Sequence, residues 1–320
     1  MLDSLHIKNF RCFEDLTIPS LGRVNLIVGK NNSGKSTLLE AISVFAQHGS
    51  YKALNEIALM RNESLSTHTI MDIFSGKDSY IGDSSKKNYI QYHFNSEHGR
   101  IETDAIKNGE RIATLSREGK NLLTENFTLA PDNYPSSLVR TIIYSDKELS
   151  EAWDQIRIQK QEKLITNALK IIDSNIENVF YTTKQNTMVS VLGEKEARPI
   201  KSMGEGMSRL LQIFLHAYQA KGGYLMIDEF ENGLHYSIQE EIWEKLFKLA
   251  KELDIQVFAT THSEDAVKAF CKVSVADKEV NGKLISLGRS ISKSDNGKII
   301  ADVYDEDTLN WLTTSGMEVR

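Results

Sequence analysis

The stretch Gly29-Lys30-Asn31-Asn32-Ser33-Gly34-Lys35-Ser36 decides the fold of this 320-residue chain. It matches the pattern G-x-x-x-x-G-K-[ST], and it follows an apolar run from Val24 to Val28 and precedes a helical stretch from about Gly34 to Gln47. A glycine-rich turn between a strand and a helix directs backbone N–H groups at phosphate oxygens, and the helix N-terminus adds its positive dipole. The sequence therefore predicts a phosphate-binding P-loop.

Two side chains of this loop carry most of the expected chemistry. Lys35 brings a positive charge to the β- and γ-phosphates of a nucleotide, and the hydroxyl of Ser36 ligates Mg²⁺. The alternative is a plain turn that only joins strand to helix, because glycine and asparagine tolerate a left-handed backbone. On the P-loop interpretation, the other residues expected to contact the nucleotide are Gly29, Lys30, Asn31, Asn32, Ser33, Gly34 and Thr37.

A second signal lies far downstream, where the apolar strand Tyr224–Ile227 ends in two acids. Carboxylates at the end of a buried strand need water, a cation or a proton nearby. Asp228 is expected to complete the Mg²⁺ site, and Glu229 to polarise the attacking water as a general base. The alternative is a strand that simply runs out into solvent.

A third signal is Ala259-Thr260-Thr261-His262-Ser263, again at the end of an apolar strand, Gln256–Ala259. The imidazole of His262 can hydrogen-bond the γ-phosphate or the attacking water. We expect it to act as a switch residue there. A lone histidine in such a place can also be a structural residue.

The fourth signal, Lys201-Ser202-Met203-Gly204-Glu205-Gly206, precedes an amphipathic helix predicted over Ser208–Ala220. Ser202 and Glu205 fit the S-x-x-E capping box, which predicts a well-capped helix start. A serine, a glycine and bare N–H groups at a helix N-terminus also form a receptor for a phosphate. The two interpretations are compatible, and Ser202, Gly204 and Glu205 are candidate nucleotide-binding residues.

Composition narrows the class of protein. Apolar residues make up 40% of the chain, and its formal net charge is −6, which weighs against a surface that grips nucleic acid everywhere. The two cysteines, Cys12 and Cys271, form no Cys-x-x-Cys pair, which fits a reducing compartment and gives no support for a zinc site. The N-terminus has no apolar run typical of a signal peptide, and we expect a cytoplasmic protein without membrane spans.

The rhythm of apolar residues predicts an α/β protein in four segments: 1–48 and 200–320 as the two parts of a nucleotide-binding core, 49–140 as an antiparallel β-rich subdomain, and 141–199 as a helical lobe. Short alternating stretches such as Asn88–Phe94 indicate strands, and Lys147 to about Glu177 has helical spacing. Leu284–Leu287 and Ile299–Val303 are expected to form a closing hairpin.

The four motifs, in this order, resemble the ABC-type ATPase heads of the RecF/SMC kind. The opening Leu5–Arg11 looks like the first strand of those heads, and the resemblance implies that Arg11 lies near the nucleotide phosphates, although it can also be a surface arginine at a strand end. It further implies ATP and Mg²⁺ as cofactors and a homodimer on ATP binding, in which Ser202 and its neighbours serve the γ-phosphate of the other subunit. Glu231-Asn232-Gly233-Leu234-His235 occupies the place of the family's D-loop, which crosses that interface.

Several features separate this chain from members of that group. Lys201, Met203 and Glu205 stand where transporters carry Leu, Gly and Gln, and there is no long coiled coil as in SMC proteins. The glutamine of the Q-loop has four candidates, Gln91, Gln155, Gln159 and Gln161.

The chain looks most like compact bacterial ATPases related to the OLD family, which are associated with phage defence or DNA repair. OLD proteins carry a fused Toprim nuclease, for which the residues after His262 leave little room. The acidic run Asp305-Glu306-Asp307 is interpreted as a solvated turn.

Three hypotheses follow from this resemblance. The chain is an ATPase that gates a separate effector such as a nuclease, or a RecF-like ATPase that clamps DNA itself, or a nucleotide sensor with negligible turnover. The segments 50–140 and 147–177 are candidates for contact with a partner protein or with DNA.

Overall fold

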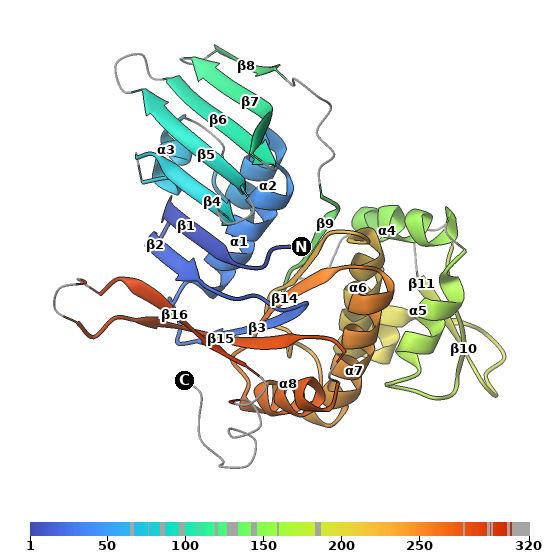
Figure 1. Ribbon diagram of the computed structural model, residues 1–320. Coiled ribbons are helices and arrows are strands. Elements are labelled where there is room, and N and C mark those ends of the chain that lie inside the picture. The colour runs from blue at the N-terminus through green and yellow to red at the C-terminus, as the bar shows by residue number, and fades with distance from the viewer. Residues whose placement is uncertain are drawn as a thin grey trace.

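The computed structural model places three β-sheets and eight α-helices among the residues that it describes (Figure 1). Two large sheets form the body of the molecule, and a small three-stranded sheet belongs to a peripheral lobe. The described residues are 1–64, 67–75, 77–83, 87–95, 100–107, 109–118, 121–126, 134–141, 146–158, 160–182, 187–277, 279–292, 295, 297–305 and 308.

The six-stranded sheet carries the strands that end in the motif residues. Its order is β16-β15-β3-β14-β13-β9, in which β16 alone runs antiparallel to its neighbour. Because the other five strands are parallel, their carboxyl ends meet at one edge, where ligands bind in open α/β sheets. The strands are β3 (Val24–Gly29), β9 (Ser136–Val139), β13 (Tyr224–Ile227), β14 (Gln256–Thr260), β15 (Gly282–Arg289) and β16 (Ile299–Tyr304).

The seven-stranded sheet is antiparallel throughout, in the order β2-β1-β4-β5-β6-β7-β8. The N-terminal hairpin therefore belongs to the same sheet as the strands of the β-rich segment. Those strands are β1 (Leu5–Phe10), β2 (Phe13–Ile18), β4 (Ser79–Asp83), β5 (Asn88–Asn95), β6 (Arg100–Lys107), β7 (Glu110–Glu118) and β8 (Asn121–Asn126).

Helix α1 (Lys35–Ala46) packs between the two large sheets, and nearly all of its residues are buried. Its apolar side chains share one core with Ile7 of β1 and Phe13 of β2 on one side, and with Tyr224 and Met226 of β13 on the other. A helix that is buried all round is held by packing rather than by propensity. The first turn of α1 is therefore fixed relative to both sheets.

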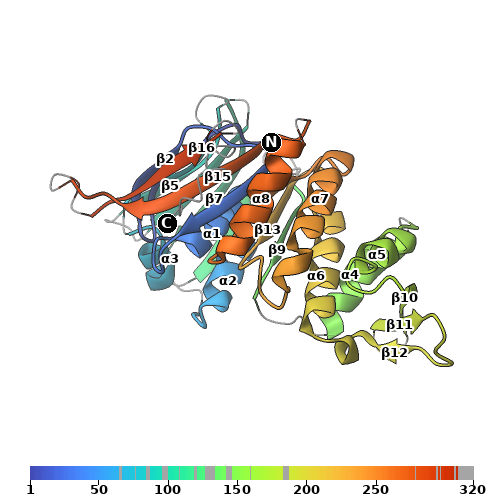
Figure 2. The same cartoon turned by 90° about the horizontal axis from the view of Figure 1, so that it is seen from below.

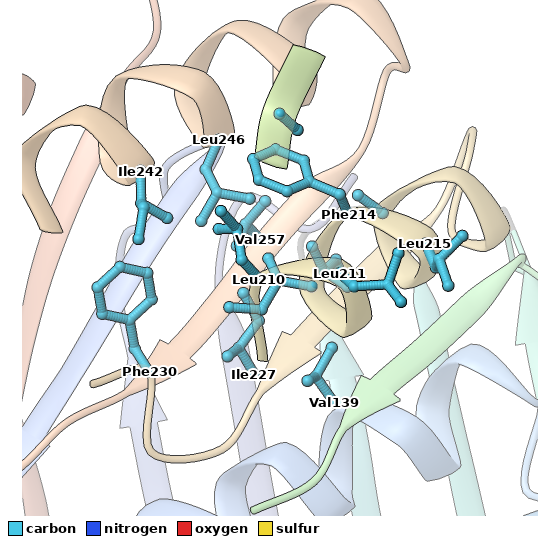
Figure 3. Close-up of a cluster of buried hydrophobic side chains, with 14 of the residues drawn as sticks. Val139, Leu210, Leu211, Phe214, Leu215, Ile227, Phe230, Ile242, Leu246 and Val257 are labelled. Atoms are coloured by element: carbon cyan, nitrogen blue, oxygen red, sulfur yellow. The ribbon is translucent and has the colours of Figure 1, made fainter. Parts of the chain in front are cut away.

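The opposite face of the six-stranded sheet is covered by α6 (Glu205–Gln219), α7 (Tyr236–Glu252) and α8 (Glu264–Ala276), which lie side by side in Figure 2. Leu225 and Ile227 of β13 point to this core, while their neighbours Tyr224 and Met226 point to α1, as the period of a strand requires. Figure 3 shows the apolar side chains of α6 against those of the sheet, among them Leu210, Leu211, Phe214, Ile227 and Val257.

The peripheral lobe is only partly helical, which corrects the expectation of helical structure to about Glu177. It consists of α4 (Asp146–Ile158), α5 (Glu162–Leu169), β10 (Ile176–Tyr181), β11 (Thr187–Val191), β12 (Arg198–Pro199) and the 3₁₀ turn Ile200–Met203. Trp153 of α4 is fully buried and donates its indole N–H to the Thr187 hydroxyl at 3.0 Å. The short hairpin thus completes the core of the lobe.

The segment 49–140 also differs from a purely β-rich one. It begins with α2 (Tyr51–Met60) and α3 (Thr67–Ile73), and it ends with β9, which belongs to the six-stranded sheet. The Ser50 hydroxyl caps α2 by accepting the Ala53 N–H at 3.2 Å. The polar composition of this stretch led to a prediction of strands alone, although α2 has an apolar face that includes Ile57. The boundaries of the four segments remain a prediction.

At the C-terminal end, the expected hairpin is present as β15 and β16. Asp305 is exposed and accepts hydrogen bonds from the backbone and hydroxyl of Thr308, which lower the pKa of its carboxyl. Glu306 and Asp307 lie outside the described residues. None of the helices within the described ranges is long and apolar enough to cross a membrane.

Candidate active site at three strand ends

The loop after β3 adopts a conformation that requires its two glycines. Gly29 has φ 146°, and a Cβ there would stand 2.4 Å from the carbonyl oxygen of Leu287. Gly34 has φ 94°, and a Cβ there would stand 2.7 Å from the ring of Phe13. Asn32, at φ 61°, supplies the third left-handed residue. The backbone of residues 29–34 therefore curls tightly into the N-terminus of α1.

Lys35 folds back over this loop. Its ammonium donates hydrogen bonds to the carbonyl oxygens of Gly29 and Lys30, at 2.7 and 3.1 Å. Burial lowers the pKa of Lys35, against the attraction of Asp228, Glu229 and Glu231, which raises it. The loop thus holds a partly desolvated positive charge, to which an anion can bind.

Ser36 and Asp228, the two predicted Mg²⁺ ligands, lie together. The Ser36 hydroxyl is 3.2 and 3.3 Å from the two carboxylate oxygens of Asp228. The Thr260 hydroxyl, at the end of β14, donates to the Asp228 carboxylate at 2.7 Å. Side chains from β3–α1, β13 and β14 thus converge at the carboxyl edge of the sheet.

These oxygen donors fit Mg²⁺. Mg²⁺ is usually bound by one or two carboxylates, with phosphate oxygens and water completing its octahedron. Among the described residues, no group of three or more His, Cys, Asp or Glu side chains could hold a metal by itself. Ser36 and Asp228 therefore suit a metal that arrives with a phosphate ligand better than a metal held by the protein alone.

Glu229, the predicted general base, has a strained backbone with φ 48°. Its N–H donates to the Thr260 hydroxyl at 2.9 Å, and its carbonyl accepts from Arg209 at 3.0 Å. A non-glycine residue in the left-handed region costs about 1–3 kcal/mol, which is tolerated where surrounding contacts enforce it. In the described part of the chain no hydrogen bond to the Glu229 carboxylate is present, so its lone pairs are available to accept a proton.

The predicted D-loop is bound to the predicted switch strand. The carboxylate of Glu231 accepts the Thr261 hydroxyl at 2.7 Å and the His262 backbone N–H at 2.8 Å. The side chain of His262 is exposed. Movement of the loop 231–235 would therefore be transmitted directly to the residue beside His262.

The structure contradicts the expected capping box. Ser202 lies in the 3₁₀ turn, and its hydroxyl donates to the carbonyl of Pro199 at 2.7 Å instead of capping α6. Helix α6 begins at Glu205, earlier than the expected Ser208, with Gly204 at its N-cap and no side-chain cap. The serine hydroxyl bonds a nearby backbone carbonyl instead, because serine side chains readily form such local bonds in competition with helix capping.

The first turn of α6 packs against the D-loop of the same chain. A Cβ at Gly206 would stand 2.7 Å from the carbonyl oxygen of Gly233. In contrast, no hydrogen bond within the described ranges joins Ser202, Gly204 or Glu205 to residues 29–37. One chain thus brings together the P-loop, the acidic pair and the switch strand, whereas residues 202–206, the signature turn, make no hydrogen bond to that P-loop within the described ranges.

Arg11 forms an ion pair on the side of α1. Its Nε lies 2.7 Å from the carboxylate of Glu40, which is one helical turn beyond Ser36. Burial lowers the pKa of Arg11, although Glu40 opposes this shift. The placement of Arg11 beside the phosphates remains a prediction.

The Q-loop glutamine also remains open. Gln91 lies in β5 between Tyr80 and Asp104, Gln155 in α4, and Gln161 just before α5. Gln159 lies outside the described residues.

Two residues of the site were not anticipated, Thr260 and Arg209. Thr260 orients both acids, as described above. Arg209, on α6 and 5% exposed, donates to the backbone carbonyls of Arg140, Asp228 and Glu229. A charged residue in an otherwise apolar helix must be paired if it is buried, and this signal could have identified Arg209 from the sequence.

Comparisons with known proteins identify the family and the fold of this chain. The model of the family described as "AAA ATPase domain" matches residues 1–144 and 141–267. An ATP/GTP phosphatase from Helicobacter pylori is 23% identical over 366 residues, which cover 97% of each chain. An OLD nuclease from Thermus scotoductus is 52% identical over 44 residues, 14% of this chain and 8% of that protein.

Among solved structures, an SMC head bound to the C-winged helix domain of ScpA aligns with a TM-score of 0.56 at 13% identity, over 96% of this chain and 98% of that one. This similarity confirms the fold, and the matches together confirm the expected resemblance to ABC-type ATPases of the RecF/SMC/OLD kind. Because the family model covers most of the sequence, the chain belongs to the AAA ATPase domain family.

Proposed function

We propose that the chain binds ATP with Mg²⁺ at residues 29–37 and hydrolyses it as a homodimer that forms on ATP binding and gates a separate effector protein. The observation that carries this proposal is the convergence of Ser36, Asp228 and Thr260 beside Lys35, since the Ser36 hydroxyl and the Asp228 carboxylate lie 3.2 Å apart. A lysine, a hydroxyl and a carboxylate grouped at a helix N-terminus suit the phosphates of a nucleotide and their metal.

Each residue has a distinct task in the proposed reaction. Lys35 exchanges its bonds to the loop carbonyls for phosphate oxygens, and Ser36 and Asp228 hold Mg²⁺, which when bound neutralises charge on the phosphates. Glu229 accepts a proton from the attacking water, with its backbone fixed by Thr260. In this proposal His262 donates to the γ-phosphate or to the attacking water.

We propose the dimer because one chain does not complete the nucleotide site with its own signature turn. The signature turn at 202–206 packs on its own D-loop through Gly206, and its residues Ser202, Gly204 and Glu205 are exposed. A second copy can supply its N–H groups and Ser202 to the γ-phosphate, so that each nucleotide lies between two subunits. Its tight link to α6 and the acidic strand end, through Arg209, makes the turn sensitive to hydrolysis.

The experiment that tests hydrolysis and dimer formation together is Glu229→Gln. The variant keeps the shape of the site but removes the base, so it should bind ATP, hydrolyse it at least a hundredfold more slowly (a general base contributes about 10²–10⁴) and accumulate as a dimer. Light scattering with ATP and Mg²⁺ measures the mass. Hydrolysis at the wild-type rate would exclude Glu229 as the base, and a monomer under these conditions would exclude the dimer.

The effector part of the proposal rests on the relatives. One matched protein is described as an OLD nuclease, and the aligned SMC head is bound to the C-winged helix domain of ScpA; these two descriptions are the basis for proposing a partner activity here. Phage defence or DNA repair in the cytoplasm is the setting that we propose. An effector isolated with Glu229→Gln in ATP, and absent with Lys35→Ala, would support gating. Turnover that rises only with DNA would instead favour a DNA clamp, and turnover near zero in every condition a nucleotide sensor.

A further inference from the structure

The residue that follows the proposed general base belongs to the apolar core. Strand β13 ends at Ile227, whose side chain points to the core shared with α6, α7 and α8. Because side chains alternate between the two faces of a strand, continued alternation would direct Asp228 toward α1 and the carboxylate of Glu229 into that apolar core. Instead Phe230 enters the core, where its ring is fully buried and points toward Ile242 of α7 (Figure 3).

The left-handed backbone of Glu229 makes this exchange. Its φ of 48° interrupts the alternation after Asp228, so that Glu229 stays half-buried at the edge of the sheet and the next side chain turns inward. The backbone N–H of Phe230 then donates to the carbonyl of Thr260 at 2.9 Å, at the end of β14. The conformation of Glu229 is therefore tied to the position of the Phe230 ring.

Trp243 of α7 holds that ring in place. The two rings are stacked, with centroids 4.0 Å apart and planes inclined by 18°, and Phe270 of α8 meets Trp243 edge to face at 5.1 Å. All three side chains are fully buried, and the burial of large aromatic rings offsets the strain of a left-handed residue. Within the described ranges the indole N–H of Trp243 has no hydrogen-bond partner, so packing holds this ring.

We infer that Trp243 is a positioning residue for hydrolysis, which by stacking on Phe230 keeps Glu229 in the conformation that presents its carboxylate to the nucleotide site. The inference rests on the proposed function, in which Glu229 is the base. Trp243 itself does not touch the nucleotide, because it is buried on the face of the sheet opposite α1. Loss of the stack lets Phe230 shift and Glu229 relax, which slows the chemical step and leaves binding at residues 29–37 unchanged.

Steady-state kinetics of Trp243→Leu test this role. The variant keeps an apolar side chain but loses the stack, and we expect kcat for ATP to fall about tenfold or more, as part of the roughly 10²–10⁴ that a general base contributes. KM and the calorimetric affinity for ATP with Mg²⁺ should stay near their wild-type values. Trp243→Phe should restore most of the rate, since a ring remains and the indole N–H has no partner to lose.

Phe247→Leu is the matched control. Phe247 lies one turn further along α7, is equally buried and meets Phe270 at 5.7 Å, but within the described residues it has no ring contact with Phe230. Both leucine variants should lower the unfolding temperature, because each shortens a buried aromatic side chain. Only Trp243→Leu should lower kcat, and equal losses of kcat in the two variants would overturn the inference. Phe230→Leu, which shortens the other ring of the stack, should lower kcat as well and serves if Trp243→Leu does not fold.

A double variant shows whether Trp243 acts through the base. When Trp243→Leu is added to Glu229→Gln, the residual rate should fall no further, because the group that Trp243 positions is already gone. Wild-type kcat in Trp243→Leu, or a full further loss in the double variant, would overturn the inference alone. Hydrolysis by Glu229→Gln at the wild-type rate would instead overturn the proposed base, and the inference with it.

Discussion

The two glycine-containing turns of the candidate site, residues 29–34 between β3 and α1 and residues 202–206 at the start of α6, are built in opposite ways. At Gly29, the carbonyl oxygen of Leu287 lies 2.4 Å from the place of a Cβ, and the loop is closed by the bonds of Lys35. At Gly204, nothing lies within 4 Å of that place, and Ser202 is exposed. The first turn is packed and closed by contacts within its own chain, while the second turn exposes its polar groups to solvent.

The outward turn is nevertheless firmly attached. Arg209, one turn into α6, binds the carbonyls of Asp228 and Glu229, and Gly206 packs on Gly233 of the D-loop. A turn that is open on one side and fixed on the other suits a surface that meets a second copy. In the proposed dimer, a buried strand end would therefore position its own chemistry and also a turn that serves the nucleotide site of the second copy.

The largest expected effect comes from adding a methyl group to each turn. Gly29→Ala combines left-handed strain with a clash against a backbone carbonyl, and should lower the free energy of unfolding by about 3 kcal/mol or more. Gly204→Ala, at φ 99° but in open space, should lower it by about 1–2 kcal/mol from strain alone. Urea unfolding measures both changes in the free energy of unfolding. Equal losses for the two variants would contradict the proposed difference in packing between the turns.

The next effect concerns the link between the regions. Arg209→Met keeps the apolar stem but leaves three partly buried carbonyls without this donor, and should lower the free energy of unfolding by about 2–3 kcal/mol. The control is Arg198→Met, because the half-exposed ion pair of Arg198 with Glu194 should contribute less than about 1 kcal/mol. If urea unfolding gave the same loss for both arginines, α6 would not be anchored through Arg209.

The sequence predicted the interactions between neighbouring residues well, and it did not predict those between residues far apart in the chain. The P-loop and its flanking elements were predictable because motif, turn chemistry and apolar runs all lie within residues 24–47. The bond from Thr260 to Asp228 joins residues 32 positions apart, and no periodicity indicates it. The capping box failed because Ser202 had a nearer acceptor in Pro199, and the contact of Arg61 with Thr37 depends on how α2 packs beside α1.

The smallest effect on stability, and the sharpest on assembly, is expected for Ser202→Ala. Among the residues that the structure describes, its exposed hydroxyl bonds only the Pro199 carbonyl, so the free energy of unfolding should change by less than about 0.5 kcal/mol. When combined with Glu229→Gln, the same change should weaken the ATP-dependent dimer severalfold in light scattering across a dilution series. An unchanged dimer would mean that the open turn does not serve a second subunit.

The most direct measurement of the central claim is calorimetric titration of Lys35→Ala with ATP and Mg²⁺. Lys35 is the buried cation of the P-loop, so its removal should weaken ATP binding about a hundredfold or more, at the scale of about 3 kcal/mol for a charged hydrogen-bonding group. The fold should remain intact by circular dichroism, and Lys52→Ala should bind as the wild type does. ATP binding by Lys35→Ala with wild-type affinity would contradict the assignment of residues 29–37 as the nucleotide site.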